Sequence, residues 1–191
     1  MRGRRALGVV ALAFASVLAA CGGTEGSAST SPSATGPGGG AAAATLAPDF
    51  TGRDVQGKTF RLSDHLGKEV VLLDFWATYC EPCKAEFPHL REMYEAKKAK
   101  GLLVVGVAMD GPETVVDVNA FVKRFELDFP VVTDEDSRIA SLYNPKKSMP
   151  LSVLIDRAGR ITVVREGYNP GDEKLVATDV DKALDQAAPQ Q

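Results

Sequence analysis

The sequence predicts an α/β fold, in which a central mixed β-sheet is flanked by helices. Two observations predict it. Residues 69–77 and 102–109 are continuous apolar runs, which are typical of strands buried on both faces in a parallel sheet. Helices are predicted at 82–100 and 112–126, after the first and second runs. A strand, helix, strand order of this kind requires a right-handed crossover and parallel strands.

The predicted domain begins near Leu46 and covers residues 46–188. It opens with a hairpin in FTGRDVQGKTFRLSD, residues 50–64, where Gln56-Gly57 forms the turn between two short extended pieces. The first buried strand, EVVLLDFWA at 69–77, follows this hairpin directly.

Gly101 is expected to end the helix at 82–100, because glycine readily adopts the left-handed conformation at a helix C-terminus. Pro112 is expected to open the helix at 112–126, which follows the second buried strand. The chain then continues with a short strand at 129–134, a short helix at 137–143, two strands at 151–156 and 161–166 joined by RAGR, and a final helix at 172–187. The closing hairpin is antiparallel, and it makes the sheet mixed.

Residues 1–20 are predicted to be a signal peptide. A positive MRGRR precedes an apolar run at 6–20, which is too short for an ordinary transmembrane helix. The run ends in Leu-Ala-Ala-Cys, which resembles the lipobox of bacterial lipoproteins. In that class the peptide is cleaved before the cysteine, here Cys21, and the sulfur carries diacylglycerol. The alternative is an ordinary secretory signal with an incidental cysteine.

Residues 21–45 are expected to form a lipidated cysteine followed by a flexible tether. The stretch 22–44 is rich in Gly, Ser, Ala and Thr and nearly without charge, so it cannot bury enough apolar surface to order itself. As a random coil it would span roughly 25 Å. We therefore expect an extracytoplasmic domain, anchored by lipid to a bacterial membrane on its periplasmic side or at the cell surface.

Charge argues against a nucleic-acid partner. The formal net charge is −3, and no concentrated basic patch is visible along the chain.

The stretch WATYCEPCKAE holds two of the three cysteines, Cys80 and Cys83, and three interpretations compete for it. Structural zinc needs four ligands, and the two histidines, His65 and His89, lie at unrelated positions. A structural disulfide across so small a loop removes little entropy from the unfolded chain. A redox pair fits best, because a single pair of thiols in an exported protein indicates disulfide chemistry. We expect no metal and no cofactor.

The position of the pair explains the chemistry. Cys80 is predicted at the mouth of a helix with Pro82 in its first turn, where free N–H groups and the helix dipole stabilise a thiolate. Cys83 lies one turn further on. Cys80 is therefore expected to have the lower thiol pKa and to attack a substrate disulfide, after which Cys83 attacks the mixed disulfide.

DFWATYCEPCKAEFP resembles the active site of thioredoxin-fold proteins. Its Cys-Glu-Pro-Cys motif with the following Glu-Phe-Pro is similar to that of the membrane-tethered TlpA/ResA-like thiol–disulfide oxidoreductases. The similarity extends over about residues 47–187. It includes the APDF opening, the segment at 57–77 that leads into the motif, and the segment SMPLSVLIDRAGRI. It also includes the helix at 112–126, which the family adds after the second strand. The chain departs from the family at Tyr79, where Trp is usual, and at Met-Pro-Leu-Ser, residues 149–152, where Pro-Thr-Thr is common. Both departures concern the shape of the substrate groove.

The resemblance implies a cis peptide bond before Pro150, which should face Cys80 and present the Met149 backbone to an extended substrate. The residues expected to bind substrate are Trp76, Tyr79, Glu81, Pro82, Met149 and Pro150.

Two acidic residues are candidate catalytic groups. Asp74 lies within an apolar strand, where a carboxyl is costly unless it is paired or neutral. It aligns with the buried acid of thioredoxin and is interpreted as the proton-transfer partner of Cys83; the alternative is a solvent-facing strand edge. Glu86 shares a helix face with Cys83, and either a catalytic role or a simple interaction with the helix dipole explains it.

The expected function is reduction of extracytoplasmic protein disulfides, with a membrane thiol protein as electron donor. Family clients include apocytochromes awaiting haem attachment, which connects the protein with cytochrome c maturation. The reverse, oxidising direction is disfavoured because Glu81 opposes thiolate formation and the motif lacks a His. Copper delivery of the Sco type needs Cys-x-x-x-Cys and a distal His, and a peroxiredoxin needs Thr three residues before its Cys. Neither pattern is present.

Overall fold

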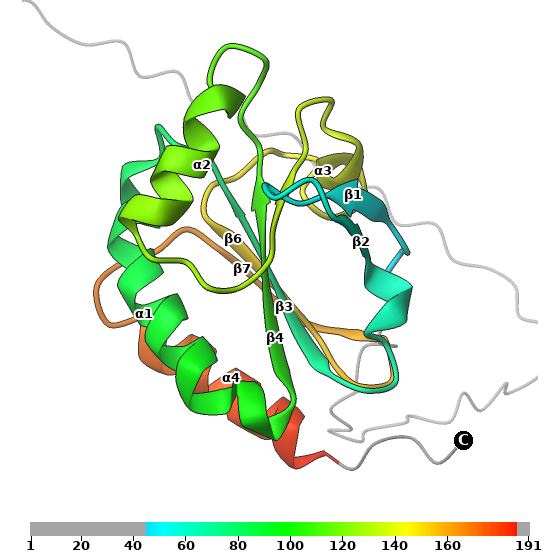
Figure 1. The fold of residues 1–191 in the computed structure, drawn as a ribbon. Helices are drawn as coiled ribbons and strands as arrows, with labels where there is room; N and C mark the ends of the chain where they lie inside the picture. The colour runs from blue at the N-terminus through cyan, green and yellow to red at the C-terminus, as the bar shows by residue number, and fades with distance from the viewer. Residues whose placement is uncertain (1–44, 187–191) are drawn as a thin grey trace, which may run out of the picture. The chain divides into compact units, whose positions relative to one another are not determined.

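The computed structural model describes residues 45–186, in which a five-stranded mixed sheet has helices on both faces (Figure 1). The strand order is β5-β4-β3-β6-β7. The strands are β3 (Val70–Trp76), β4 (Leu102–Ala108), β5 (Val131–Thr133), β6 (Leu151–Ile155) and β7 (Ile161–Glu166). The expected α/β class and mixed sheet are confirmed.

The central strand β3 carries the functional region. It pairs in parallel with β4 and antiparallel with β6, and all seven of its residues are buried. Both neighbours supply backbone hydrogen bonds and both faces are covered, which accounts for a sequence that is apolar except for Asp74. Because β3 runs parallel to β4, both strands deliver their following loops to the same edge of the sheet.

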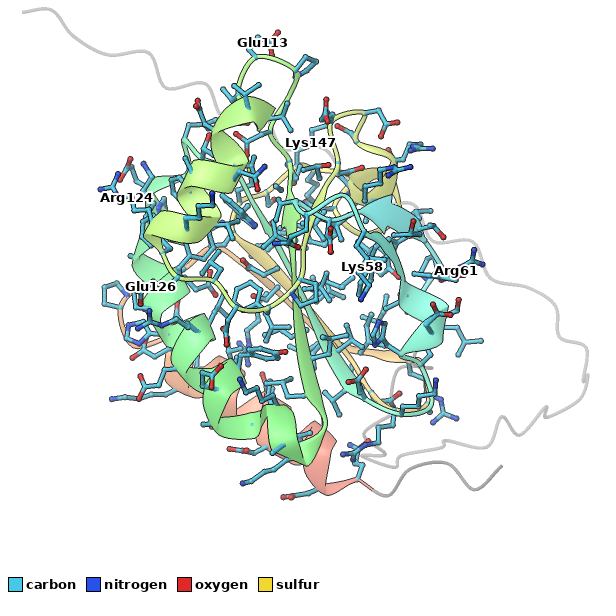
Figure 2. The ribbon with its side chains drawn as sticks, viewed as in Figure 1. Lys58, Arg61, Glu113, Arg124, Glu126 and Lys147 are labelled. Atoms are coloured by element: carbon cyan, nitrogen blue, oxygen red, sulfur yellow. A yellow bond between two sulfur atoms is a disulfide. The ribbon has the colours of Figure 1, made fainter. Side chains whose placement is uncertain are left out.

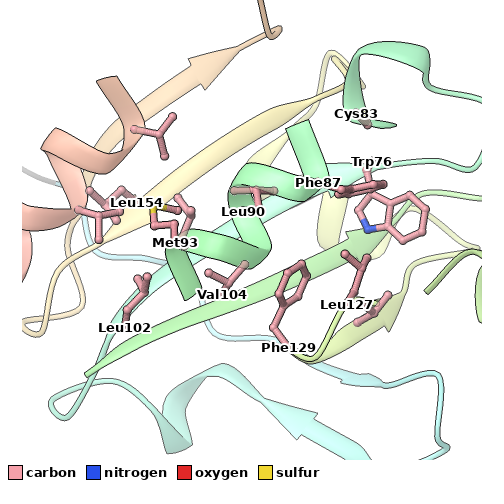
Figure 3. Close-up of a cluster of buried hydrophobic side chains, with 14 of the residues drawn as sticks. Trp76, Cys83, Phe87, Leu90, Met93, Leu102, Val104, Leu127, Phe129 and Leu154 are labelled. Atoms are coloured by element: carbon pink, nitrogen blue, oxygen red, sulfur yellow. The ribbon is translucent and has the colours of Figure 1, made fainter. Parts of the chain in front are cut away.

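One face of the sheet is covered by α1 (Glu81–Lys97), α2 (Val115–Arg124) and α4 (Glu173–Asp185) (Figure 1). The core beneath them is aromatic near the end of β3. The Trp76 and Phe87 rings meet edge to face at 5.0 Å, and Phe121 lies 5.2 Å from Trp76. Burial of each large side chain contributes on the order of 2 kcal/mol. Figure 3 shows Cys83 at this end of the cluster, together with Trp76 and Phe87.

The opposite face holds the N-terminal hairpin and α3 (Arg138–Tyr143). The hairpin consists of β1 (Thr51–Arg53) and β2 (Thr59–Arg61), and a 3₁₀ turn at Leu62–Asp64 follows it. The Tyr143 hydroxyl donates a hydrogen bond to the Pro48 carbonyl, which ties α3 to the start of the domain.

The predicted helices are present with shorter bounds. α1 ends at Lys97 and continues as a 3₁₀ turn, Lys98–Lys100, before Gly101 takes a φ of 94°. The inserted helix begins at Val115 because the residues after Pro112 first form a turn, in which Gly111 C=O accepts the Thr114 N–H.

The predicted signal peptide, the lipidation of Cys21 and the tether all fall outside residues 45–186. Across the part of the chain that the structure describes, no helix combines the length and apolarity needed to cross a membrane. Charged side chains of both signs point outward around this domain; Figure 2 labels Lys58, Arg61, Glu113, Arg124, Glu126 and Lys147.

Candidate active site

Cys80 and Cys83 form a disulfide at the N-terminus of α1. The S–S distance is 1.98 Å and the Cα atoms are 5.4 Å apart. Cys80 is the N-cap residue, with extended backbone, and its Sγ accepts the Cys83 N–H at 3.3 Å. Cys83 is completely buried, whereas Cys80 is 7% exposed. Cys80 is thus the less buried of the two cysteines, and its sulfur already accepts a backbone hydrogen bond.

The turn before Cys80 is fixed to the neighbouring strand. The Cys80 N–H donates to Ala77 C=O at 3.0 Å, which closes a turn around Thr78 and Tyr79. The Thr78 N–H and hydroxyl both donate to the carboxylate of Asp110, which follows β4 and is fully buried. Sequence reasoning missed Asp110. The available signal was an acidic residue almost directly after a buried parallel strand, at the edge where such sites form.

The Met149–Pro150 peptide bond is cis, as the resemblance implied. Pro150 directly precedes β6, whose Leu151 pairs with Phe75 near the end of β3. The cis bond therefore lies at the same sheet edge as the turn that leads to Cys80. Met149 is half-buried and packs against the core cluster that contains both cysteines.

The other residues expected to contact substrate differ in exposure. Tyr79 is 59% exposed, and Glu81 and Pro82 are exposed beside it. Trp76 is fully buried between Phe87 and Phe121, so its side chain supports the site from below and offers no open surface in this disulfide form.

Asp74 and Glu86 bring two carboxyl groups into the interior. Asp74 lies on β3 opposite Ser152, is fully buried, and neither of its oxygens has a hydrogen-bond partner within residues 45–186. Burial raises the pKa of Asp74 to about 7. Burial also raises the pKa of Glu86, to about 9, with further upward contributions from the charges of Asp74 and Asp172 and a lowering by the Ser152 hydroxyl. Each ionised carboxyl opposes ionisation of the other, so the pair retains a proton near neutral pH.

Glu86 links this pair to two clefts. One, of about 260 Å³, lies between α1 and α4 and is lined by Glu86, Leu90, Met93 and Val176. The second, of about 200 Å³, is lined by Glu86, Ser152 and Tyr168 among others. At 4% exposure, Glu86 is buried, although it lies only five residues after the first residue of α1. The residues that line these clefts with it include members of α4, β6 and β7, which no local pattern around Glu86 encodes.

The two histidines lie apart from the cysteines. His65 Nδ1 is 2.6 Å from Glu69 Oε2 and its ring stacks on Phe60, whereas His89 is exposed near Tyr168. Among residues 45–186, no three His, Cys, Asp or Glu side chains are arranged to hold a metal ion.

Comparison with known proteins agrees with this geometry. The AhpC/TSA family model matches residues 43–164, which is more than half of the chain. The thiol–disulfide oxidoreductase ResA of Geobacillus kaustophilus is 33% identical over 148 residues, covering 78% of this chain and 79% of that protein. The chain belongs to the AhpC/TSA family and is a TlpA/ResA-like protein.

Two further proteins are similar to this TlpA/ResA-like chain. ResA of Bacillus cereus is 40% identical over 115 residues, which is 60% of this chain and only 64% of that relative's length. A Chlorobium tepidum structure, proposed to be the thiol:disulfide interchange protein DsbE, matches with a TM-score of 0.68 and 36% identity. It covers 74% of this chain and 96% of the Chlorobium chain, so the thioredoxin-like fold is shared almost throughout that structure.

Proposed function

We propose that this TlpA/ResA-like protein is an extracytoplasmic thiol–disulfide oxidoreductase that reduces protein disulfides through Cys80 and Cys83. The observation that supports it best is the disulfide across the N-terminus of α1, in which the sulfur of the less buried cysteine accepts a helix N–H. That environment stabilises a thiolate at Cys80 once the pair is reduced. The names of the ResA relatives, which are thiol–disulfide oxidoreductases, support the same reaction.

The reaction proceeds by two exchanges. The Cys80 thiolate attacks one sulfur of a client disulfide, a mixed disulfide forms, and the other client sulfur leaves as a thiolate. Cys83 then loses its proton and attacks the Cys80 sulfur, which re-forms the Cys80–Cys83 disulfide and releases the second client thiol. Two electrons pass from the pair to the client. A thiol donor at the membrane restores the reduced pair.

Asp74 and Glu86 serve the second exchange in this proposal. Cys83 is fully buried, so its proton must pass to a group inside the protein. Glu86 lies three residues after Cys83 and therefore on the same face of α1, and Asp74 is electrostatically coupled to Glu86. With its pKa raised to about 7, Asp74 can accept a proton near neutral pH.

Client recognition is assigned to the surface around the disulfide. Tyr79, Glu81 and Pro82 supply exposed side chains, and the Met149 backbone before cis-Pro150 receives an extended client segment. We infer that the clients are extracytoplasmic protein disulfides, with apocytochromes c favoured by the likeness to ResA-like proteins. Lipid on Cys21 would hold the domain at the membrane through the tether.

The direction of electron flow is tested by the reduction potential of the pair. A reductase should equilibrate with glutathione near the thioredoxin value of about −270 mV, rather than near the DsbA value of about −120 mV. A potential above about −180 mV would assign the protein as an oxidant instead.

A further inference from the structure

Asp110 is a buried acid whose partner is the active-site turn. It is fully buried, and no cation pairs with it among the ion pairs of residues 45–186. Its carboxylate accepts the Thr78 N–H at 3.0 Å and 3.3 Å and the Thr78 hydroxyl at 2.5 Å. Burying a carboxylate is costly unless such hydrogen bonds compensate it, so the two residues hold each other in place.

The bond joins two segments that are distant in sequence. Asp110 and Thr78 are 32 residues apart, and the Met109 N–H donates to Trp76 C=O at 2.7 Å beside them. The loop after β3 is thus fastened to the loop after β4 by both backbone and side chain. Thr78 is the first central residue of the turn that Cys80 N–H closes on Ala77 C=O.

Cys80 depends on this turn for its position. The turn ends at Cys80, whose Sγ accepts the Cys83 N–H at 3.3 Å only while the N-cap geometry is kept. We propose that Asp110 is a positioning residue for thiol–disulfide exchange, which acts through Thr78 to hold the Cys80 sulfur at the N-terminus of α1. This inference rests on the proposed function, in which Cys80 is the attacking thiol.

Two effects of Asp110 on Cys80 oppose each other, and variants separate them. Positioning stabilises the Cys80 thiolate, whereas the negative charge of Asp110 destabilises it. Asp110→Ala removes both the hydrogen bonds to Thr78 and the negative charge. Thr78→Val removes the hydroxyl contact and leaves the charge, and Thr78→Ser keeps the hydroxyl. If positioning dominates, Asp110→Ala and Thr78→Val should both slow the reaction of the Cys80 thiol.

The experiment measures the alkylation rate of Cys80 against pH in the full chain carrying Cys83→Ser, with the labelled peptide identified by mass spectrometry. Asp110→Ala should slow alkylation at neutral pH about tenfold, because misplacement of a reacting group is costly. Thr78→Val should slow alkylation less than Asp110→Ala does, and Thr78→Ser should leave it near the wild-type rate. The variant that combines Asp110→Ala with Thr78→Val should be no slower than Asp110→Ala alone.

Asp134 provides a matched control. It is also a buried carboxylate beyond the end of a strand, and it accepts the N–H groups of Ile139 and Ala140 at 2.9 Å and 2.8 Å. Asp134→Ala should lower thermal stability without changing Cys80 alkylation. Where Asp110→Ala does not fold, Thr78→Val tests positioning, and Asp110→Asn, which keeps an acceptor oxygen, shows the effect of the charge alone.

Two results would overturn the proposal: alkylation unchanged in Asp110→Ala (or in Thr78→Val where Asp110→Ala does not fold), or alkylation accelerated by loss of the Asp110 charge while Thr78→Val has no effect. The second result would assign the effect to charge. Failure of the proposed function is distinct, because it would appear as slower alkylation of Cys80 in the Cys83→Ser chain than of Cys83 in the Cys80→Ser chain.

Discussion

In the proposed mechanism, Asp74 is the residue whose chemistry separates the two exchanges. The first attack needs only the Cys80 thiolate, whereas the second requires Cys83 to lose a proton inside the protein. Asp74→Asn keeps the shape of the side chain and removes the base. It should slow resolution of the mixed disulfide about tenfold or more and leave the initial attack nearly unchanged. Stopped-flow kinetics with a model disulfide resolve the two phases, and equal slowing of both would show that Asp74 is not the base for Cys83.

The stability of the fold should report the same carboxyl. The pKa of Asp74 is 3.8 in its unperturbed state and about 7 in the folded protein. Between these values the folded state binds a proton that the unfolded state does not, so the free energy of unfolding falls as pH rises. Asp74→Asn removes this loss. The variant should be more stable than the wild type by on the order of 2 kcal/mol at pH 8, and the difference should shrink toward pH 4.

Urea unfolding at several pH values measures this difference, and the disulfide should be kept intact in both proteins. Asp185→Asn is a suitable control, because Asp185 is exposed near the end of α4. A stability difference that is the same at pH 4 and pH 8 would contradict a raised pKa at Asp74.

At the scale of elements, the proposed mechanism expects the N-terminus of α1 to increase the reactivity of Cys80 and Glu81 to oppose this effect. The Glu81 side chain is 80% exposed and pairs with Lys84 at 2.5 Å. Glu81→Gln removes a negative charge beside the thiolate and should therefore accelerate Cys80 alkylation at neutral pH by about two- to threefold.

Salt dependence checks the cause of this effect. Because the charge is exposed, the acceleration should diminish at high ionic strength. Glu92→Gln, at an exposed position further along α1, should have little effect. Slower alkylation in Glu81→Gln would show that Glu81 assists the thiol instead.

The elements themselves were largely predictable from sequence. The fully buried strands β3 and β4, the hairpin at 50–64 and the inserted helix follow from apolar runs and from turn residues, which act locally. Helix ends were predicted too long because terminal turns are decided by local hydrogen bonds, as in the 3₁₀ turn before Gly101.

The candidate site was predictable only in part. The cysteines and the cis bond were expected from motifs, but the Asp110–Thr78 contact joins residues 32 positions apart. The surroundings of Glu86 likewise include residues of α4, far along the chain. Neither a charge nor a periodicity near these residues distinguishes a buried acid from a solvated one, because tertiary packing decides it.

At the scale of the whole molecule, Cys21 should determine where the protein is found. Lipidation of Cys21 requires its thiol, so Cys21→Ser should move the protein from the membrane fraction to the soluble fraction or leave an unprocessed precursor. Fractionation with mass measurement follows both outcomes. Cys80→Ser is the control and should remain in the membrane fraction. Unchanged membrane association and mass in Cys21→Ser would exclude lipidation at this position.

The account depends most on the assignment of Cys80 as the attacking thiol and Cys83 as the resolving one. The most direct measurement treats the reduced Cys83→Ser chain with a model peptide disulfide and locates the trapped adduct by mass spectrometry. In the Cys83→Ser chain, the proposed mechanism predicts a stable mixed disulfide on Cys80 that forms at nearly the rate of the first phase of the wild type. In the Cys80→Ser chain, it predicts almost no mixed disulfide on Cys83. A mixed disulfide that forms faster on Cys83 of Cys80→Ser than on Cys80 of Cys83→Ser would contradict it.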